Sequence, residues 1–396
     1  MTSTGIRDRV AIVGMGCTPF GEHWTKSIDD LLIDAVTECV SSSGTRLDDI
    51  DAFWIGTKDS GQSGMTLSRP LKLDHKPVTR VENFCATGSE TLRNACYAVA
   101  SGAYDSAMAV GVEKLKDSGL SGLVVGAPPN DGTEPDLTPP AMFSLLAPAY
   151  AARYGLDDEQ MKDVLTRIAW KNHANGAKNP LAQFRKPVSL QDIRESPLVA
   201  GMLGVYDCSG VADGAAAALV VRAEDAYRYT DRPMFVKALG LASGPADGAM
   251  RSDYDYTTFP EVVRSAQDAY RQAGIDDPRS QISMAEVHDC FTPTELVLME
   301  DLGFSGRGEA WQDVLDGSFD LDGDLPVNPD GGLKSFGHPI GASGLRMQYE
   351  MWLQFRGEAG ERQLDAPALG LTHNLGGQPG ACVSFVSIVG AEPTPA

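Results

Sequence analysis

The 396-residue sequence lacks long apolar runs, paired-cysteine motifs and any excess of basic charge. No apolar run approaches the roughly 20 residues needed to cross a bilayer, so a membrane-spanning protein is not predicted. The 33 Lys and Arg residues are outnumbered by 54 Asp and Glu residues, which gives a net charge of −21. Such a chain repels nucleic acid and anionic lipid, so neither is an expected partner.

The seven cysteines are scattered and show no C-x-x-C spacing; they stand at positions 17, 39, 85, 96, 208, 290 and 382. An odd, dispersed set in a chain of this length does not indicate a disulfide framework or a structural zinc site. The first residues show no signal-type apolar segment, and the last ones match no address or lipidation signal. We therefore expect a cytoplasmic protein with reduced thiols.

The chain does contain an alternation of strand and helix patterns. Strands are expected at residues 10–13, 52–55, 106–112, 234–240, 282–287, 368–372 and 382–389, and helices at 28–40, 86–101, 259–274, 294–302 and 341–355. This alternation is typical of a mostly parallel sheet covered by helices. The length favours two or three domains of about 150 residues each.

The two ends of the chain repeat one local pattern, a reactive side chain before a helix with a glycine three residues later. The pairs are Cys85 with Gly88 and His338 with Gly341. We interpret them as a diverged duplication, with halves at residues 1–230 and 231–396. Residues 115–205 differ from both halves. A Gly-, Pro- and Asp-rich stretch at 126–140 precedes helix-like patterns at 142–154 and 158–176, which favours a lid or insertion on the first half.

Cys85 lies in Asn83-Phe-Cys-Ala-Thr-Gly88, at the expected start of a helix. Free amides and the helix dipole at that position favour a thiolate, so we predict a lowered thiol pKa. A thiolate there is suited to acyl transfer. The alternative is a small buried hydrophobic residue, the usual fate of an intracellular cysteine.

His338 lies in a glycine- and proline-rich segment, residues 328–344, which favours a tight loop that approaches a ligand. A histidine there can accept the thiol proton; the alternative is a histidine that only caps the helix. His288 and Cys290 follow an apolar strand and are two residues apart, so both would face one side of an extended segment. They could also bind a metal, although no third ligand has a recognisable spacing.

A fourth element is the glycine-rich segment 372–380, which contains Asn374 and Gly376. We expect a turn whose amides point at a developing oxyanion, with a plain turn before the last strand as the alternative. The remaining candidates show no such pattern and are expected to be structural: His23, His75, His173, His373, Cys208 and Cys382.

Together and in this order, these elements resemble the thiolase superfamily, nearest to the sterol-carrier-protein-type thiolases. Four segments carry the resemblance: Trp170-Lys-Asn-His, Tyr206-Asp-Cys-Ser, His288-Asp-Cys-Phe and Gly337-His-Pro-Ile-Gly-Ala-Ser-Gly. The resemblance spans residues 10–389. It implies an α/β thiolase fold with two duplicated βαβαβαββ halves in five layers, α-β-α-β-α, a loop domain over an acyl-CoA site, and homodimers or homotetramers.

The resemblance also implies residue roles. Cys85 would be acylated, His338 would activate it, and His288 would hold the thioester oxygen. Many thiolases carry a second catalytic cysteine in the last glycine-rich loop, but Asn374-Leu-Gly376 stands there in this chain. Cys290 would then be the acid/base, as in sterol-carrier-type members. Gly376 and the amide of Cys85 would form the second oxyanion hole.

The function implied is that of an acetyl-CoA C-acetyltransferase or 3-ketoacyl-CoA thiolase, with the coenzyme A thioester as substrate and no cofactor. One alternative is an acyltransferase to another acceptor or a retro-aldolase, which in some relatives works with a small OB-fold partner. A non-catalytic scaffold or lipid carrier is disfavoured by the reactive side chains. Because coenzyme A is anionic, we expect local groups such as Arg185 and Lys186, or backbone amides, to bind it.

Overall fold

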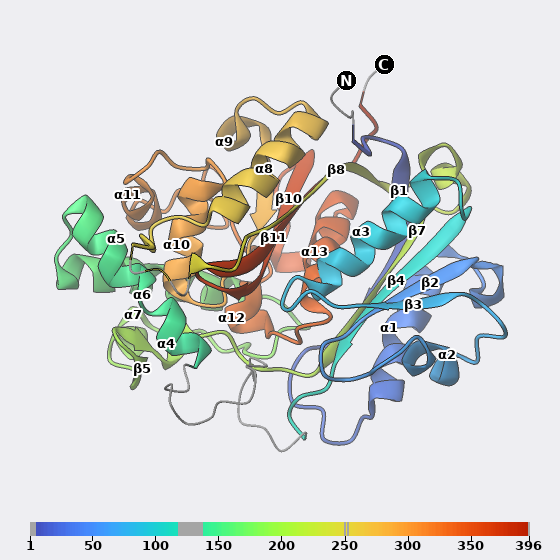
Figure 1. Cartoon of the computed structure of the whole chain (residues 1–396), viewed down its shortest axis with the longest axis horizontal. Helices are drawn as coiled ribbons and strands as arrows, with labels where there is room; N and C mark the ends of the chain where they lie inside the picture. Colours follow the sequence, from blue (N-terminus) through green and yellow to red (C-terminus); the bar gives the residue numbers. More distant parts are fainter. Residues whose placement is uncertain (1–4, 118–137, 249–250, 252, 395–396) are drawn as a thin grey trace.

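The computed structural model describes residues 5–117, 138–248, 251 and 253–394. In these residues one sheet has nine strands in the order β3-β2-β4-β7-β1-β8-β11-β10-β9 (Figure 1). The strands are β1 Val10–Cys17, β2 Ala52–Gly56, β3 Val78–Val81, β4 Ser106–Glu113, β7 Gly214–Arg222, β8 Met234–Ser243, β9 Met284–Glu286, β10 Leu369–Gln378 and β11 Ala381–Gly390. Two short strands, β5 Leu198–Ala200 and β6 Leu203–Gly204, pair separately.

The sheet is mixed, so the expectation of a mostly parallel sheet is wrong. Parallel pairing is confined to β2 with β3, β2 with β4, and β9 with β10 among the described strands. The unpredicted strand β7 runs antiparallel to both β4 and β1. A short antiparallel contact, Ala11 with Phe235 and Ile12 with Met234, joins the strands of the two halves. The pattern of apolar residues indicates which strands are buried but does not determine their direction, so the antiparallel pairs could not be predicted from it.

Each half of the chain contributes one part of the sheet, β3-β2-β4-β7-β1 and β8-β11-β10-β9, and helices lie on both sides of each part. This arrangement gives the predicted five layers. Helix α1 (Ile28–Ser43) packs on the outer face of β1, β4 and β7. Helices α3 (Thr87–Ala100) and α13 (Ser343–Arg356) lie against each other between the two halves. Helix α8 (Pro260–Ala273) packs on β8 and β11. Helix α1 begins at a capping box between Ser27 and Asp30 and ends at the left-handed Gly44, which satisfies its end groups.

The insertion contains α4 (Pro139–Phe143), α5 (Leu146–Tyr154), α6 (Asp158–Gly176) and α7 (Leu190–Arg194). The helical stretches predicted at 142–154 and 158–176 are observed, the first with a break at residues 144 and 145, whereas residues 126–137 of the Gly- and Pro-rich stretch lie outside the described residues. The placement on the first half is wrong. Helices α5 and α6 pack against α10 (Thr292–Asp301), and α6 also packs against α11 (Ala310–Leu315) and α12 (Gly332–Phe336), all in the second half.

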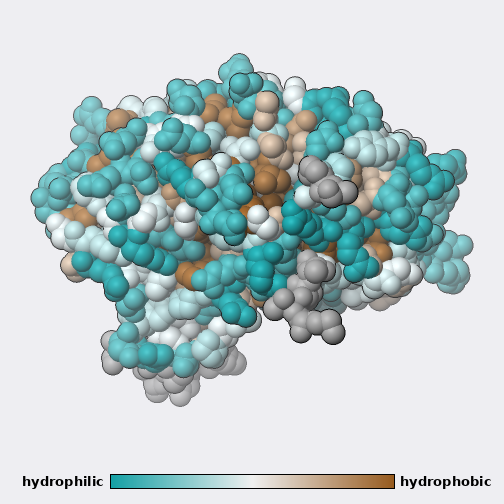
Figure 2. Space-filling model, turned by 90° about the horizontal axis from the view of Figure 1, so that it is seen from above, coloured by the Kyte–Doolittle hydropathy of each residue, from teal (hydrophilic) through white to brown (hydrophobic). Residues whose placement is uncertain are grey.

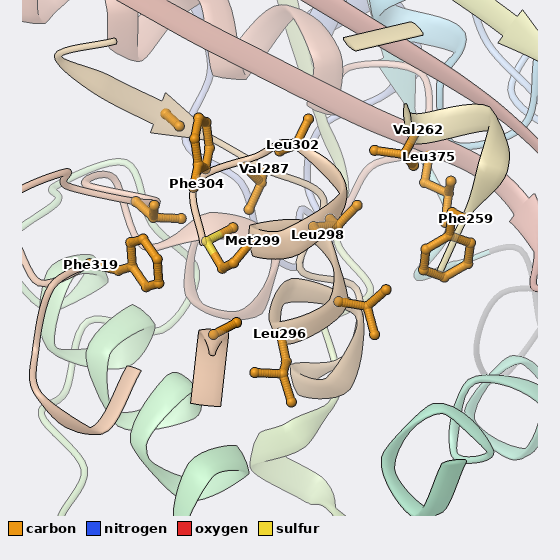
Figure 3. Close-up of a cluster of buried hydrophobic side chains, with 14 of the residues drawn as sticks. Phe259, Val262, Val287, Leu296, Leu298, Met299, Leu302, Phe304, Phe319 and Leu375 are labelled. Atoms are coloured by element: carbon orange, nitrogen blue, oxygen red, sulfur yellow. The ribbon is translucent and has the colours of Figure 1, made fainter. Parts of the chain in front are cut away.

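The reason for this placement is an apolar core that the insertion shares with the second half. Figure 3 shows the part of this core around α10. Side chains of α6 such as Leu165 and Ile168 belong to the same buried cluster as Leu296 and Leu298 of α10. A position between two segments of the sequence does not determine which of them an apolar stripe will cover. Burial against α10 fixes the insertion next to the His288 segment.

The surface matches the composition. Hydrophilic side chains dominate the face shown in Figure 2, in keeping with the net charge of −21. Among the residues that the structure describes, none of the helices combines the length and apolar character required to span a membrane.

Candidate active site

Three predicted site residues from distant parts of the chain come together. One Sγ or ring-nitrogen atom from each of Cys85, His288 and His338 lies within 4.8 Å of the others. The two rings meet edge to face, with centroids 5.4 Å apart. With Cys290 they line a cavity of about 50 Å³ whose remaining walls are mainly apolar: Lys58, Phe84, Pro139, Phe143, Ser209, Phe291, Ile340 and Gly377. The spatial convergence predicted from the motifs is therefore present.

The turn that carries Cys85 is sharp and internally bonded. It connects β3 to α3, and Phe84 adopts a left-handed φ of 49°, which a bulky side chain rarely adopts and which costs about 1–3 kcal/mol. The Thr87 hydroxyl donates to the Phe84 carbonyl at 2.5 Å and accepts from the Asn83 amide at 2.8 Å. These bonds hold Cys85 at the cavity wall just before the helix.

The predicted lowering of the Cys85 pKa is wrong. Burial raises the pKa of this thiol to about 12, and the positive charge of Lys58 only partly opposes this effect. Glu113 and Glu82 raise it further. The helix start gives too little stabilisation to outweigh loss of solvent around a thiolate. Cys85 is therefore a neutral thiol at pH 7 and needs a base to become a nucleophile.

His338 is placed to be that base, because its hydrogen bonds fix one tautomer. Its Nδ1 lies 2.7 Å from Ser343 Oγ, and the Ser343 hydroxyl donates its own proton to the Pro339 carbonyl at 3.1 Å. Ser343 must therefore accept from Nδ1–H, which leaves the lone pair on Nε2. Nε2 is buried and has no hydrogen-bond partner among the described residues. Burial lowers the pKa of His338 to about 3, so the ring is neutral.

His288 is fixed in the opposite tautomer. The Ser89 hydroxyl donates to Asn374 Oδ1 at 2.5 Å, which orients the Asn374 amide nitrogen toward His288 Nδ1 at 3.4 Å. Nδ1 is then the acceptor, and Nε2 carries the hydrogen. Burial comes first, and repulsion from His338 and His373 whenever those rings are protonated adds to it; together they lower the pKa of His288 well below its usual value. The site thus pairs a neutral acceptor, His338, with a neutral donor, His288.

Gly376 lies next to the Cys85 loop, but the turn predicted over 372–380 occupies only residues 379 and 380, directly before the last strand. Strand β10 continues through this segment to Gln378, and Gly376 is opposite Val383 of β11. A Cβ atom on Gly376 would lie 2.4 Å from the Asn83 carbonyl oxygen, so only glycine allows this approach. Gly377, rather than Gly376, lines the cavity.

Cys290 lines the same cavity as His288, as their spacing predicted. Its Sγ lies 3.6 Å from Thr294 Oγ1, and burial raises the pKa of the thiol far above its usual value. Three side chains that could together bind a metal do meet in the described residues, namely Cys85, His288 and His338, because thiolate and imidazole groups both bind zinc. Cys290, which the sequence paired with His288 as a possible ligand, is not in that cluster.

A buried carboxylate that the sequence analysis missed joins two loops of the site. Glu113, at the end of β4, accepts hydrogen bonds from the Thr57 hydroxyl at 3.0 Å and from the Lys58 and Asp59 amides at 3.0 and 2.9 Å. It also accepts from the Gly341 amide at 3.2 Å, three residues beyond His338. The available signal was an acidic residue directly after an apolar strand, where a buried charge must have partners.

Asp289 connects the His288 segment to the segment that leads to His338. Its carboxylate accepts from the Leu333 amide at 2.6 Å, the Lys334 amide at 3.2 Å and the Asn172 side chain at 2.8 Å. Two of the motifs singled out in the sequence, Trp170-Lys-Asn-His and His288-Asp-Cys-Phe, therefore meet in one buried network. This network fixes His288 and Cys290 relative to α12.

A larger groove of about 1130 Å³ shares Ser209 with the cavity. The Ser209 amide donates to the Cys290 carbonyl at 2.8 Å, so the groove begins beside the reactive groups. Its lining includes the two predicted cations, Arg185 and Lys186, both exposed. The remaining lining residues include His173, Gln183, Phe184, Val188, Pro197, Val199, Val205, Tyr206, Cys208 and Lys334.

These features define an acyl-transfer type of site on a duplicated α/β fold, and sequence comparison agrees. The chain belongs to the thiolase family: residues 10–224 match the thiolase N-terminal domain and residues 244–389 the thiolase C-terminal domain-like family. An acetyl-CoA acetyltransferase of Methanothermobacter thermautotrophicus is 37% identical over 95% of this chain and 98% of its own length. Sterol carrier protein 2 of Bos taurus is 30% identical over 94% of this chain and 70% of its own.

Solved structures show the same fold. A chain of an Ltp2-ChsH2(DUF35) aldolase superposes with a TM-score of 0.84 at 26% identity, covering 98% of this chain and 100% of that one. Human mitochondrial 3-ketoacyl-CoA thiolase superposes with a TM-score of 0.68 at 16% identity, over 98% of this chain and 99% of its own. The predicted thiolase fold is thus confirmed, and the chain is a thiolase-family enzyme.

Proposed function

We propose that the chain is a thiolase that moves an acyl group from a coenzyme A thioester to Cys85, and from there to a second coenzyme A species. The observation that carries this is the meeting of Cys85, His338, His288 and Cys290 at one cavity. The relative from M. thermautotrophicus, named an acetyl-CoA acetyltransferase, supports this reaction class. An acetyl-CoA C-acetyltransferase or 3-ketoacyl-CoA thiolase is the specific activity proposed.

In the first half-reaction, Cys85 Sγ attacks the thioester carbonyl while His338 Nε2 takes the thiol proton. This transfer is needed because the raised pKa of Cys85 keeps the sulfur protonated. The carbonyl oxygen becomes an anion that accepts a hydrogen bond from His288 Nε2–H. Collapse of the intermediate expels the coenzyme A thiolate, which takes the proton back from His338. Both histidines begin and end neutral.

In the second half-reaction, the Cys290 thiol, which its raised pKa keeps protonated at pH 7, first gives its proton to the neutral His338 across the shared cavity. The Cys290 thiolate then removes a proton from the α-carbon of a second thioester, and His338 returns its proton to Cys290 when the step is complete. The resulting carbanion attacks the acyl carbon on Cys85, and the Cys85 sulfur leaves with the proton that Cys290 accepted. The Cys85 amide and Gly376 would hold the anionic oxygen in this step. In the reverse direction, coenzyme A takes up the acyl group from Cys85 by thiolysis.

The larger groove would hold the coenzyme A part of the substrate. It starts at Ser209 beside the reactive groups and carries Arg185 and Lys186, whose charges suit phosphate in an otherwise acidic chain. Apolar lining residues such as Val188 and Tyr206 suit the arm between the thioester and the nucleotide.

A second candidate is a retro-aldolase that works with a small OB-fold partner. The observation in its favour is the likeness to the chain solved in an Ltp2-ChsH2(DUF35) aldolase, which has the higher TM-score. Val199 and Val205 at the larger groove are 49% and 51% exposed, and Leu198, next to Val199 in the chain, is 68% exposed. Together they form an apolar surface that a partner would cover. Cys85 favours the thiolase, because carbon–carbon cleavage by a retro-aldol route needs no acylated nucleophile.

The deciding experiment is intact-protein mass after mixing with acetyl-CoA or acetoacetyl-CoA, for wild type, Cys85→Ala and Cys290→Ala. We expect wild type and Cys290→Ala to gain an acyl mass that Cys85→Ala lacks, and only wild type to turn over. A wild-type chain that never acylates, even in single turnover with longer acyl-CoAs, would overturn the thiolase. Cleavage of a β-hydroxyacyl-CoA that appears only after a DUF35-type protein is added would then establish the aldolase.

A further inference from the structure

A buried histidine outside the reaction centre has no hydrogen-bond partner in the part of the chain that the structure describes. His173, in the last turn of α6, is 4% exposed, and neither of its ring nitrogens has a partner among the described residues. Its ring lies edge to face with Tyr206 at 5.3 Å between centroids, and 6.2 Å from Phe184. All three residues line the larger groove. From the sequence, this histidine is expected to be structural.

The other polar groups near His173 do not satisfy it. Lys334 Nζ donates to the carbonyls of Asp207 and Asp289, both at 2.9 Å. Gln183, which lines the same groove, donates its Nε2–H to the Val211 carbonyl at 3.3 Å, while its Oε1 is also buried without a partner among the described residues. Two neighbouring side chains thus keep unused hydrogen-bonding atoms at one groove wall.

Leaving these buried nitrogen and oxygen atoms without hydrogen bonds is energetically unfavourable, so their presence at the groove needs an explanation. Burying a polar group without a partner destabilises the fold, and native structures contain few such groups. Burial, with the nearby positive charge of Lys334, lowers the pKa of His173 to about 4, so the ring is neutral at pH 7. A neutral imidazole presents one donor and one acceptor. That is the complement of a secondary amide, which also has one of each.

We propose that His173 is a substrate-binding residue that hydrogen-bonds an amide of the pantetheine arm of coenzyme A. The inference rests on the proposed function. In that function the thioester lies at Cys85, the phosphates lie at Arg185 and Lys186, and the arm occupies the groove from Ser209 outward. The polar groups of that arm are its amides and a hydroxyl, and His173 with Gln183 offers the matching partners in an apolar groove. Tyr206 and Phe184 hold the ring in place.

The test is calorimetric binding of coenzyme A to wild type, His173→Phe and His173→Gln. Phenylalanine keeps the aromatic packing and removes both polar atoms, whereas glutamine keeps a donor and an acceptor. Loss of one neutral hydrogen bond is worth about 0.5–1.5 kcal/mol, so we expect His173→Phe to bind coenzyme A about 2- to 10-fold more weakly. His173→Gln should recover part of that affinity.

Two controls assign the loss to the arm. Adenosine 3′,5′-bisphosphate, which lacks the arm, should bind wild type and His173→Phe equally. His23→Phe, a histidine outside the groove, should bind coenzyme A like wild type. Thermal unfolding should show that His173→Phe is at least as stable as wild type at pH 7, because no protein hydrogen bond is lost.

Equal affinity of wild type and His173→Phe for coenzyme A would overturn the proposal, as would an equal loss for the bisphosphate. So would a wild-type chain that does not bind coenzyme A. These measurements need no turnover. A chain that binds coenzyme A through His173 but never acylates would refute the thiolase while leaving this inference standing.

Discussion

Ser343 is expected to control the rate of acylation although it touches no substrate. It is fully buried and accepts the Nδ1–H of His338 at 2.7 Å. In Ser343→Ala, the tautomer that leaves Nε2 free would keep a buried N–H without a partner, at about 1–3 kcal/mol. The tautomer with the hydrogen on Nε2, which cannot accept the Cys85 proton, bears less of this cost, because its N–H would face the Cys85 sulfur, a weak acceptor across the cavity. The active form should therefore become a minor population.

A cost of that size corresponds to acylation about 5- to 150-fold slower. The assay is rapid-quench single turnover with saturating acetyl-CoA, followed by intact mass of the acyl-Cys85 adduct. Ser43→Ala is the matched control, because Ser43 is also a buried helical serine that donates to a backbone carbonyl, here of Val40 in α1. Ser343→Ala should add no further loss to His338→Ala. A rate within twofold of wild type, in a folded Ser343→Ala protein, would refute the tautomer argument.

Two further predictions concern pH. The pKa of Cys85 is raised to about 12, so the rate of its alkylation by iodoacetamide should rise about tenfold per pH unit from pH 7 to 10. The rate is measured by intact mass, with Cys85→Ala as the control. A plateau below pH 8 would contradict this prediction. The pKa of His173 is lowered to about 4, below its unfolded value of about 6.5, so its contribution to stability is present above pH 6.5 and lost as the pH falls. The drop in unfolding free energy from pH 7 to 5, measured by urea denaturation, should be about 2 kcal/mol smaller in His173→Phe. An unchanged drop would show that the histidine is already charged in the fold.

The residues that meet at the cavity could be predicted because each lies in a recognisable local sequence pattern. Cys85 and His338 precede helices and have glycines three residues on, and His288 and Cys290 follow an apolar strand. Helices α1 and α8 were likewise readable, since a 3.6-residue apolar period and end signals are local properties. The layer arrangement followed from the family resemblance and not from periodicity alone.

What could not be predicted depends on neighbours distant in the sequence. Strand β7, Gly-Ala-Ala-Ala-Ala-Leu-Val-Val-Arg, has small residues that fit a close-packed centre but carry little strand signal. The thiol pKa of Cys85 depends on how completely the second half covers it. Glu113 is recognisable as a positioning residue only from the structure, where its carboxylate accepts a hydrogen bond from the Gly341 amide. The same applies to His173, whose missing partners are a property of packing.

The position of α3 and α13 between the two halves has a consequence for how the enzyme fails. The nucleophile comes from one half and both histidines from the other, so neither half holds a complete set of reagents. Activity therefore depends on the two halves remaining packed together. Heat, denaturant or a cut between residues 224 and 244 can loosen this packing. Any of these treatments should abolish acyl transfer while most helices and strands remain folded. A molecule damaged in this way becomes inactive. Its Cys85 thiol, separated from both histidines, does not consume thioesters without forming product.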